Sequence, residues 1–170
     1  MENQSPVVYF VIPCYNEEAV LPETVKRLTE KLDSMREKGL ASPESRMLLV
    51  DDGSRDATWS LISGFHEKNP YVEGVKLAHN RGHQNALLCG LMTARESCDC
   101  AISLDADLQD DTGVLDQFVE KYLEGCDVVY GVRSKRETDT WFKRTTAEGF
   151  YKVMKALGAD VVFNLSLIHI

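Results

Sequence analysis

Short apolar runs alternate along this chain with longer stretches in which apolar residues recur at helical spacing. A continuous apolar run is typical of a strand that is buried on both faces of a parallel sheet. Runs of this kind predict strands over residues 7–12, 47–50, 72–77, 100–104 and 127–130, and the first run stops at Pro13.

Between these runs, apolar residues three and four positions apart predict amphipathic helices. The first helix is expected to end at Gly39, and the second is expected to run from an Asp56 cap to about residue 66. A further helix is capped by Asp111 or Thr112, and a last one ends near residue 157. The predicted inward faces consist of Leu21, Val25, Leu28, Leu32 and Met35 in the first helix, Leu87, Leu88, Leu91 and Met92 in the helix over 84–96, and Leu115, Phe118, Val119 and Tyr122 after residue 112.

Strict alternation of strand and helix predicts a single α/β domain, a mostly parallel sheet flanked by helices and joined by right-handed crossovers. Sheets of this kind bind ligands at the carboxyl ends of their strands. Charged clusters follow the first, second, fourth and fifth predicted strands. The sequence therefore places its polar chemistry along one edge of the sheet.

Charge and cysteine content narrow the class of protein. The formal net charge of −8 argues against a nucleic-acid partner, because nucleic-acid-binding proteins carry a basic face. Five cysteines at irregular spacings indicate reduced thiols. The first six residues lack a basic segment, and the run 7–12 is too short for a signal peptide or a membrane span, so a cytoplasmic location is expected.

The acidic cluster after the fourth predicted strand indicates a metal site. Residues two apart in a strand point the same way, so Asp105 and Asp107 are expected to bring their carboxylates together. At ~5 Å and an effective dielectric of about 20, their repulsion is roughly 3 kcal/mol, which favours a compensating cation. Hard divalent ions, Mg²⁺ or Mn²⁺, suit such oxygen ligands, and Gln109 adds a carbonyl oxygen. The alternative is a solvated acidic loop.

Two further clusters suit a nucleoside. One acid of the pair Asp51 and Asp52 is expected to face the crevice, where it would accept the imide N–H of uracil or guanine; the alternative is an Asp-rich turn. After the first strand, Tyr15 offers a flat face to a base and Glu17 offers oxygens to ribose hydroxyls. Alternatively, Glu17 only favours the start of the following helix.

Basic and neutral polar side chains complete the set of candidates. His83 lies in a polar turn and is an available acid or base without an evident partner. Residues 133–144 contain five basic and two acidic side chains, an excess of three positive charges in an acidic chain. Such a loop is either a solvated surface or, at the end of a strand, a contact for phosphates; Arg133 is its first member.

Three of these segments, taken together and in this order, resemble the polyprenyl-phosphate subgroup of family-2 glycosyltransferases. They are 11–18 (VIPCYNEE), 50–56 (VDDGSRD) and 105–110 (DADLQD). The subgroup includes dolichol-phosphate mannosyltransferases and bactoprenol glucosyltransferases. The resemblance implies the A-type nucleotide-binding sandwich and a role for each matching residue: Pro13, Tyr15, Glu17, Val50 and Asp52 for the nucleoside, Asp105, Ala106, Asp107 and Gln109 for the donor and its cation, and Arg133 for the donor phosphates.

The resemblance implies an inverting transfer of sugar from UDP-hexose or GDP-mannose to a polyprenyl phosphate, with Asp105, Asp107 and Arg133 taking part in catalysis. Two alternatives stay open: a saccharide hydroxyl acceptor with Asp110 or Asp111 as base, and a fragment that binds the donor without catalysis. An aspartyl phosphatase would carry its D-x-D on the first strand, not the fourth.

The last residues depart from the family pattern. The segment 165–170 (LSLIHI) stands where an acceptor-side segment is expected, so we expect a domain over 1–164, incomplete at its C-terminus, followed by a non-native tail. In the full-length protein, a following segment would bring the domain to the cytoplasmic face of a membrane.

Overall fold

A computed structural model of the chain describes residues 5–107, 111–132 and 165–169. The chain divides into two compact units, one made of Met1–Val129 with His169–Ile170 and the other of Tyr130–Ile168. The first unit contains the elements that carry most of the predicted site, in the order β1 (Val8–Cys14), α1 (Leu21–Glu37), β2 (Arg46–Asp51), α2 (Thr58–His66), β3 (Val72–Lys76), α3 (His83–Ala94), β4 (Cys100–Ser103), the 3₁₀ helix η1 (Thr112–Val114) and α4 (Leu115–Leu123).

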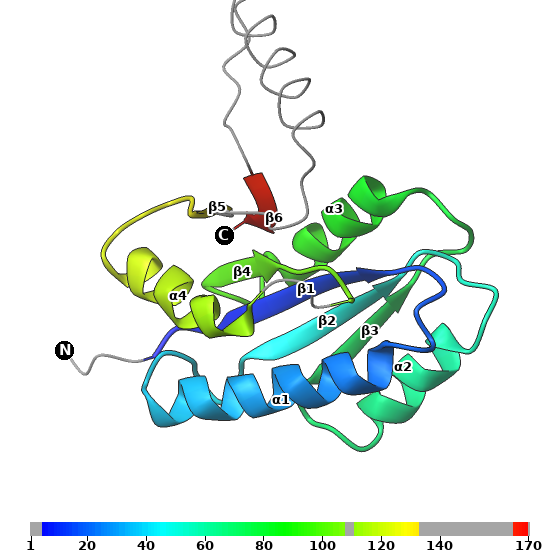
Figure 1. The fold of residues 1–170 in the computed structure, drawn as a ribbon, viewed down its shortest axis with the longest axis horizontal. Coiled ribbons are helices and arrows are strands. Elements are labelled where there is room, and N and C mark those ends of the chain that lie inside the picture. The colour runs from blue at the N-terminus through cyan, green and yellow to red at the C-terminus, as the bar shows by residue number, and fades with distance from the viewer. Residues whose placement is uncertain (1–4, 108–110, 133–164, 170) are drawn as a thin grey trace, which may run out of the picture. The chain divides into compact units, whose positions relative to one another are not determined.

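The strands of the first unit form a four-stranded parallel sheet in the order β3-β2-β1-β4 (Figure 1). Val11 of β1 pairs with Leu48 of β2 and with Ser103 of β4, which fixes the register at the centre of the sheet. The predicted α/β class, with a mostly parallel sheet between helices, is confirmed. The five cysteines form no disulfide.

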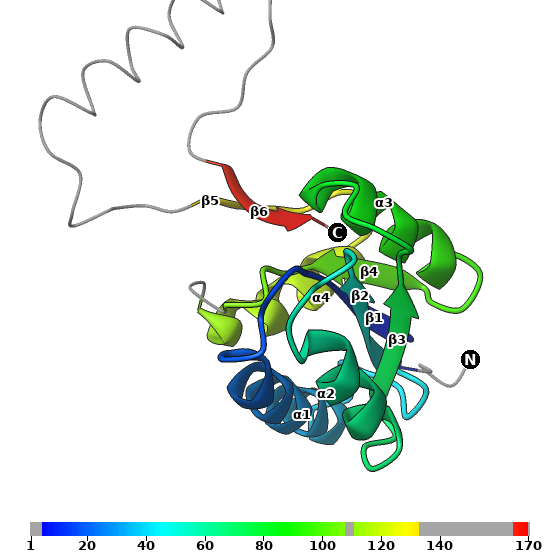
Figure 2. The same ribbon diagram turned by 90° about the vertical axis from the view of Figure 1, so that its right-hand side faces the viewer.

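Helices cover both faces of this sheet, with α3 on one face and α1 and α2 on the other (Figure 2). Lys31 of α1 and Lys38, the C-cap residue of that helix, contact Asp116 of α4 at 2.8 and 2.6 Å, so α4 lies beside α1. Alternate side chains of a strand point to opposite faces, which is why both faces of β1 are apolar. The core under α3 consists of Tyr9, Val11, Leu48 and Val50 with Ala86 and Ala94.

The prediction that the first strand stops at Pro13 is wrong, since β1 continues to Cys14. The carbonyl of Val11 accepts from Leu104 on the β4 side, and the carbonyl of Cys14 accepts from Asp52 on the β2 side. By alternation, the nitrogen of Pro13 faces the β4 side, beyond the last β4 pair. The missing N–H of proline therefore costs no ladder hydrogen bond there.

The predicted apolar face of the third helix is correct for Leu87 and Leu91, which are partly buried against the core under α3, and wrong for Leu88 and Met92. Leu88 and Met92 are each 56% exposed, and the buried residues of α3 are Ala86, Gly90 and Ala94. Small residues let the helix lie close to the sheet: a Cβ on Gly90 would overlap the Cγ1 of Val11 and lie 2.9 Å from the Cγ2 of Val50. Hydrophobicity alone could not indicate this face, because close approach selects for small side chains.

The helix ends follow the predicted signals with small shifts. Gly39 has φ +72° directly after the last turn of α1, and Asp111 caps η1 by accepting the N–H of Gly113 at 2.7 Å. Asp56 is not the N-cap of α2, because the helix begins at Thr58 with Ala57 as its cap residue. Asp56 nevertheless accepts the N–H of Thr58 at 3.0 Å, which stabilises that helix start.

Two further strands, β5 (Tyr130–Val132) and β6 (Leu165–His169), pair with each other and not with the parallel sheet. The fifth strand was predicted over 127–130 in that sheet, so both its position and its partner differ. Val128 and Tyr130 are 53% and 47% exposed, which a central parallel strand does not allow. The predicted last helix lies outside the described residues, and the origin of 165–170 stays a prediction.

The packing of α3 predicts that Gly90→Ala destabilises the protein. The added methyl meets Val11 and Val50, and overpacking costs about 1–3 kcal/mol, more than the ~1 kcal/mol that alanine contributes to a helix. Gly64→Ala in α2 is the matched control, since no atom lies within 4 Å of its Cβ position and stability should rise. Urea unfolding measures both; a Gly90→Ala variant as stable as the parent would contradict the close approach.

Candidate functional site

The loops after β1 and β2 are joined by hydrogen bonds at the carboxyl edge of the sheet. The N–H of Asn16 donates to the hydroxyl of Ser54 at 2.9 Å, and the N–H of Glu17 donates to the hydroxyl of Thr58 at 2.8 Å. In return, Arg55 donates its N–H to the side-chain oxygen of Asn16 at 2.9 Å. Bonds in both directions hold the two predicted nucleoside segments as one structure.

Asp52 fixes the next loop along the edge, the one between β3 and α3. Its carboxylate is buried and accepts the N–H of Arg81 at 2.6 Å and the N–H of Gly82 at 2.9 Å. Gly53 has φ +70°, and a Cβ there would lie 2.6 Å from the backbone of His79 and Asn80. The sequence did not indicate this contact between loops; it predicted only that Asp52 binds the base of a nucleoside. A carboxylate has about four acceptor positions, so the base-binding role stays a prediction.

Asp51 is buried, as its neighbour Asp52 is. Its side chain is fully buried, and one oxygen accepts the N–H of Ser54 at 3.0 Å. Beneath it, burial, with the charges of Glu17 and Asp51, raises the pKa of the Cys14 thiol far above its usual range. Cys14 is therefore a neutral core residue and takes no part in nucleophilic chemistry.

The acidic loop, residues 104–107, leaves the sheet at the end of β4. The N–H of Leu104 still donates to the carbonyl of Val11 at 3.0 Å. Two residues further along the loop, the carbonyl oxygen of Ala106 accepts a hydrogen bond from the buried hydroxyl of Thr24 at 2.5 Å. Ala106 is buried, whereas Asp105 and Asp107 on either side of it are not. The middle of the D-x-D is thus anchored and its two acids are accessible.

His83 has a partner that the sequence did not indicate. As the first residue of α3, it lies with its Nε2 3.8 Å from Oδ1 of Asp105, and both side chains are nearly half exposed. The two residues are 22 positions apart in sequence, and no local signal links them. The β3–α3 loop therefore also borders the acidic loop.

Glu17, in the loop after β1, lies close enough to the acidic loop to feel the charges of its two aspartates. Burial raises the pKa of its carboxyl, and the charges of Asp107, Asp56 and Asp105 raise it further. The carboxylates of the acidic loop therefore lie close enough to Glu17 to oppose its ionisation. Such a concentration of hard oxygen donors fits a divalent cation such as Mg²⁺ or Mn²⁺.

Of the remaining predicted site residues, the structure describes Tyr15 and Val50 but not Gln109 and Arg133. Tyr15 is 40% exposed, as a stacking face requires, and Val50 is buried in the core beneath α3. Gln109 and Arg133 lie outside the described residues. Over 5–107 and 111–132, no group of three or more His, Cys, Asp or Glu side chains is arranged to hold a metal. The described residues thus supply a pair of aspartates, and the third predicted ligand is Gln109.

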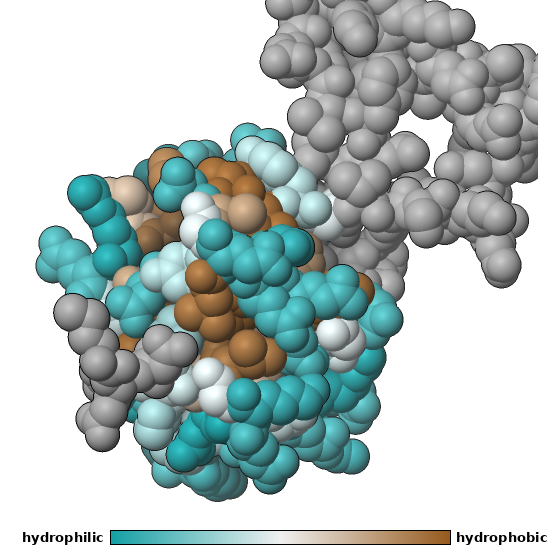
Figure 3. Space-filling view, turned by 90° about the vertical axis from the view of Figure 1, so that its left-hand side faces the viewer, coloured by the Kyte–Doolittle hydropathy of each residue, from teal (hydrophilic) through white to brown (hydrophobic). Residues whose placement is uncertain are grey.

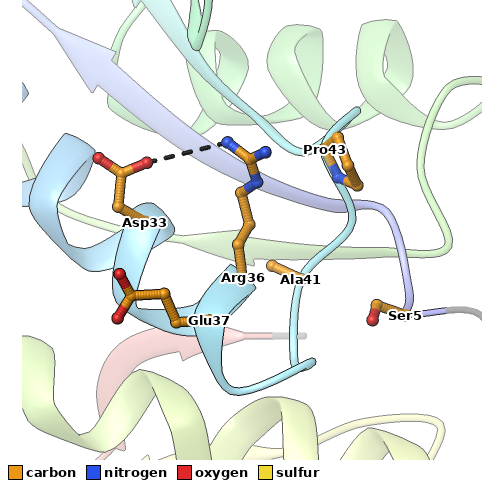
Figure 4. Close-up of a pocket in the computed structure, with 6 residues that line it drawn as sticks. All are labelled: Ser5, Asp33, Arg36, Glu37, Ala41 and Pro43. Atoms are coloured by element: carbon orange, nitrogen blue, oxygen red, sulfur yellow. Dashed lines mark ion pairs between the residues drawn. The ribbon is translucent and has the colours of Figure 1, made fainter.

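A hollow of about 560 Å³ lies at the other end of the sheet (Figure 4). Ser5 precedes β1 and Pro43 precedes β2, so this hollow borders the amino ends of the strands. The ion pair between Arg36 and Asp33, 3.8 Å apart, lies at its edge. It contains none of the predicted site residues.

The surface of the first unit combines polar side chains with apolar ones. Figure 3 shows apolar side chains gathered in a band across one face, with polar side chains on both sides. The large apolar side chains that are exposed in this unit are Tyr15, Leu88, Met92, Leu123 and Val128. None of the helices that the structure describes has the length and apolar character to cross a membrane.

Comparison with known proteins gives a family and several relatives. The family model for glycosyl transferase family 2 matches residues 9–166. The glycosyltransferase YkoT of Bacillus subtilis is 52% identical over 164 residues, which are 96% of this chain and 49% of YkoT. The prophage bactoprenol glucosyl transferase homolog of Escherichia coli is 37% identical over 94% of this chain and 55% of its own length. The chain thus spans about half the length of these relatives.

Solved structures agree on the fold. A mannosyltransferase from Pyrobaculum calidifontis, in complex with GDP-Man and Mn²⁺, matches with a TM-score of 0.60 and 25% identity over 88% of this chain and 39% of its own. Glucosyl-3-phosphoglycerate synthase from Mycobacterium tuberculosis, with Mn²⁺ and UDP, matches with a TM-score of 0.61 and 22% identity over 96% of this chain and 55% of its own. The predicted A-type glycosyltransferase fold is confirmed.

The crowding around Glu17 predicts a pH-dependent effect of Glu17→Gln. The raised pKa in the folded state means that this carboxyl stabilises the fold below its unfolded pKa and that the contribution is lost as pH rises through the folded pKa. Glutamine stays neutral, so without divalent cations the variant should melt at a higher temperature than the parent at about pH 7. The gain should vanish below about pH 4.

Melting curves across this pH range test the effect, with Glu30→Gln, an exposed position of α1, as the control for loss of one negative charge. A Glu17→Gln variant that gains no stability over Glu30→Gln at neutral pH would contradict the crowding.

Proposed function

Because the chain belongs to glycosyl transferase family 2, we propose that it binds a nucleotide-sugar donor at the carboxyl edge of its sheet, and that the whole protein transfers the sugar, with inversion, to a polyprenyl phosphate. The observation that carries the proposal is the acidic loop: Ala106 is anchored by Thr24, and Asp105 and Asp107 lie in the field of Glu17. These carboxylates meet beside the segments predicted for a nucleoside.

The nucleoside would lie over the joined loops after β1 and β2. Tyr15 offers an exposed ring for stacking, and Glu17 offers oxygens to the ribose. Asp52 would accept the imide N–H of uracil or guanine, with Pro13 and Val50 forming the rigid support beneath. The mannosyltransferase from Pyrobaculum calidifontis was solved with GDP-Man, and the proposed donors are UDP-hexose and GDP-mannose.

Asp105, Asp107 and Gln109 would hold Mg²⁺ or Mn²⁺ on the donor diphosphate. When bound, the cation neutralises negative charge that develops on the departing diphosphate. The protein's part is to hold two carboxylates close together at the end of β4, which the Ala106 anchor favours. Arg133 would add positive charge to the same phosphates.

A polyprenyl phosphate as acceptor needs no strong protein base, because its oxygen is already ionised near neutral pH. The relative in Escherichia coli is described as a bactoprenol glucosyl transferase homolog, which supports this acceptor. A basic segment is needed to bring two anions together, and residues 133–144 supply one. The protein would then work at the cytoplasmic face of a membrane, through a segment beyond this domain.

A saccharide hydroxyl as acceptor is the second candidate, and it needs a carboxylate base. Asp111 was one of two candidates for that base. Its carboxylate caps η1 by accepting the N–H of Gly113 at 2.7 Å, which assigns it a structural part. Asp110 lies outside the described residues. The cap bond of Asp111 counts against it as the base, and Asp110 stays a candidate.

Product analysis on a full-length protein separates the two acceptors. The protein is incubated with labelled UDP-glucose or GDP-mannose, Mn²⁺ and either a polyprenyl phosphate or an oligosaccharide. Label that moves into the organic phase with the polyprenyl phosphate supports the proposal. Label found only in the saccharide would contradict it, and label in neither would contradict transfer to both acceptors.

The metal assignment predicts that Asp107→Asn removes metal-dependent nucleotide binding and leaves the fold intact. An amide in place of one carboxylate weakens the hold on a hard cation, so Mn²⁺-dependent affinity for UDP or GDP should fall by more than about tenfold. Calorimetric titration with and without Mn²⁺ measures it, and circular dichroism checks the fold. Asp127→Asn, another exposed aspartate, is the control. Equal Mn²⁺-dependent affinity in both variants would refute the site.

The basic segment predicts that Arg133→Ala weakens donor binding more than it lowers stability. Loss of a charge-assisted contact to the diphosphate should reduce affinity for the nucleotide sugar about 10- to 150-fold, a loss of about 1.5–3 kcal/mol. Arg27→Ala on the exposed side of α1 has the same change in charge and should bind as the parent does. If both variants bind the donor equally well, Arg133 has no such contact.

A further inference from the structure

We propose that Thr24 is a positioning residue for the acidic loop: its hydroxyl fixes the backbone between Asp105 and Asp107 and thereby sets the separation of the two carboxylates. The inference rests on the proposed function in one respect, namely that these carboxylates hold a cation. The anchoring itself is a property of the protein without ligand.

The contact joins two distant parts of the chain in the interior. Thr24 lies in the first turn of α1 and is 2% exposed. Its Oγ1 lies 2.5 Å from the carbonyl oxygen of Ala106, 82 residues away, and 3.1 Å from the carbonyl oxygen of Val20 in its own helix. A hydroxyl has one proton to donate, and the shorter of the two distances is the one to Ala106.

Other threonines show what an ordinary helix position does. Thr29 of α1 and Thr93 of α3 donate to the carbonyl four residues earlier, at 2.7 and 2.8 Å. Such bonds stay within one helix and specify nothing outside it. Thr29 also accepts a bond from Asn69, but Thr24 differs because its hydroxyl donates to another segment, and that segment is the centre of the D-x-D.

The position of the bond between Thr24 and Ala106 explains how it restrains the acidic loop. The acidic loop leaves the sheet at Leu104, and two residues later Thr24 holds the backbone of Ala106. Repulsion between Asp105 and Asp107, together with the field of Glu17, favours movement of the loop away from the sheet. A buried hydrogen bond to the carbonyl between the two acids opposes that movement. The carboxylates then need no rearrangement when a cation arrives.

Three variants test the inference. Thr24→Val removes the hydroxyl with little change of shape, and Thr24→Ser keeps the hydroxyl. Thr29→Val is the matched control, because it lies on the same helix and loses both a bond to Val25 and one from Asn69. If Thr24→Val does not fold, Thr24→Ala takes its place.

The first measurement is hydrogen–deuterium exchange of residues 100–107 without ligand. Exchange there should be faster in Thr24→Val than in the parent, Thr24→Ser or Thr29→Val. The second is Mn²⁺-dependent affinity for UDP or GDP, which should fall about 10-fold or more in Thr24→Val and stay within about twofold in the other two, as for other residues that orient metal ligands.

Unchanged exchange in Thr24→Val would overturn the inference, as would an equal loss of affinity in Thr29→Val, which would reflect stability alone. A parent protein without Mn²⁺-dependent nucleotide binding would refute the proposed function instead. In that case the exchange comparison still decides whether Thr24 holds the loop.

Discussion

The parallel pairing of β1 with both β2 and β4 is the constraint on which the site depends. Because all four strands run the same way, their carboxyl ends and the loops that follow meet at one edge of the sheet. Segments separated by tens of residues thereby bring acidic side chains together. Burial raises the pKa of Glu17, and the carboxylates that converge there raise it further.

This arrangement works against the stability of the ligand-free protein. Like charges at the edge repel one another, and the polypeptide compensates with backbone hydrogen bonds to side chains that fix each loop. Asn16, Asp52 and Thr24 each serve a different loop in this way. These hydrogen bonds hold the loops of the acidic edge in place without a ligand, as preorganised cation binding would require.

Most of the fold follows from the sequence, because periodic burial determines it. The four parallel strands and the faces of α1 and α4 lie where apolar periodicity predicts them. The failures occur where a different physical quantity decides: close packing at Gly90 selects small residues on α3, and the direction of the nitrogen at Pro13 lets β1 continue. The prediction of a fifth parallel strand near Tyr130 is wrong because a short apolar run does not specify the strand with which it pairs.

The sequence by itself determined which chemical groups the edge would carry, since the acids come directly after buried strands and parallel topology collects strand ends. It could not determine how these groups are held. That Asp52 accepts two N–H groups at the start of α3, that His83 lies near Asp105 and that Thr24 bonds to Ala106 depend on contacts between remote segments. Such contacts exist only after the sheet and helices have packed, so no local pattern encodes them.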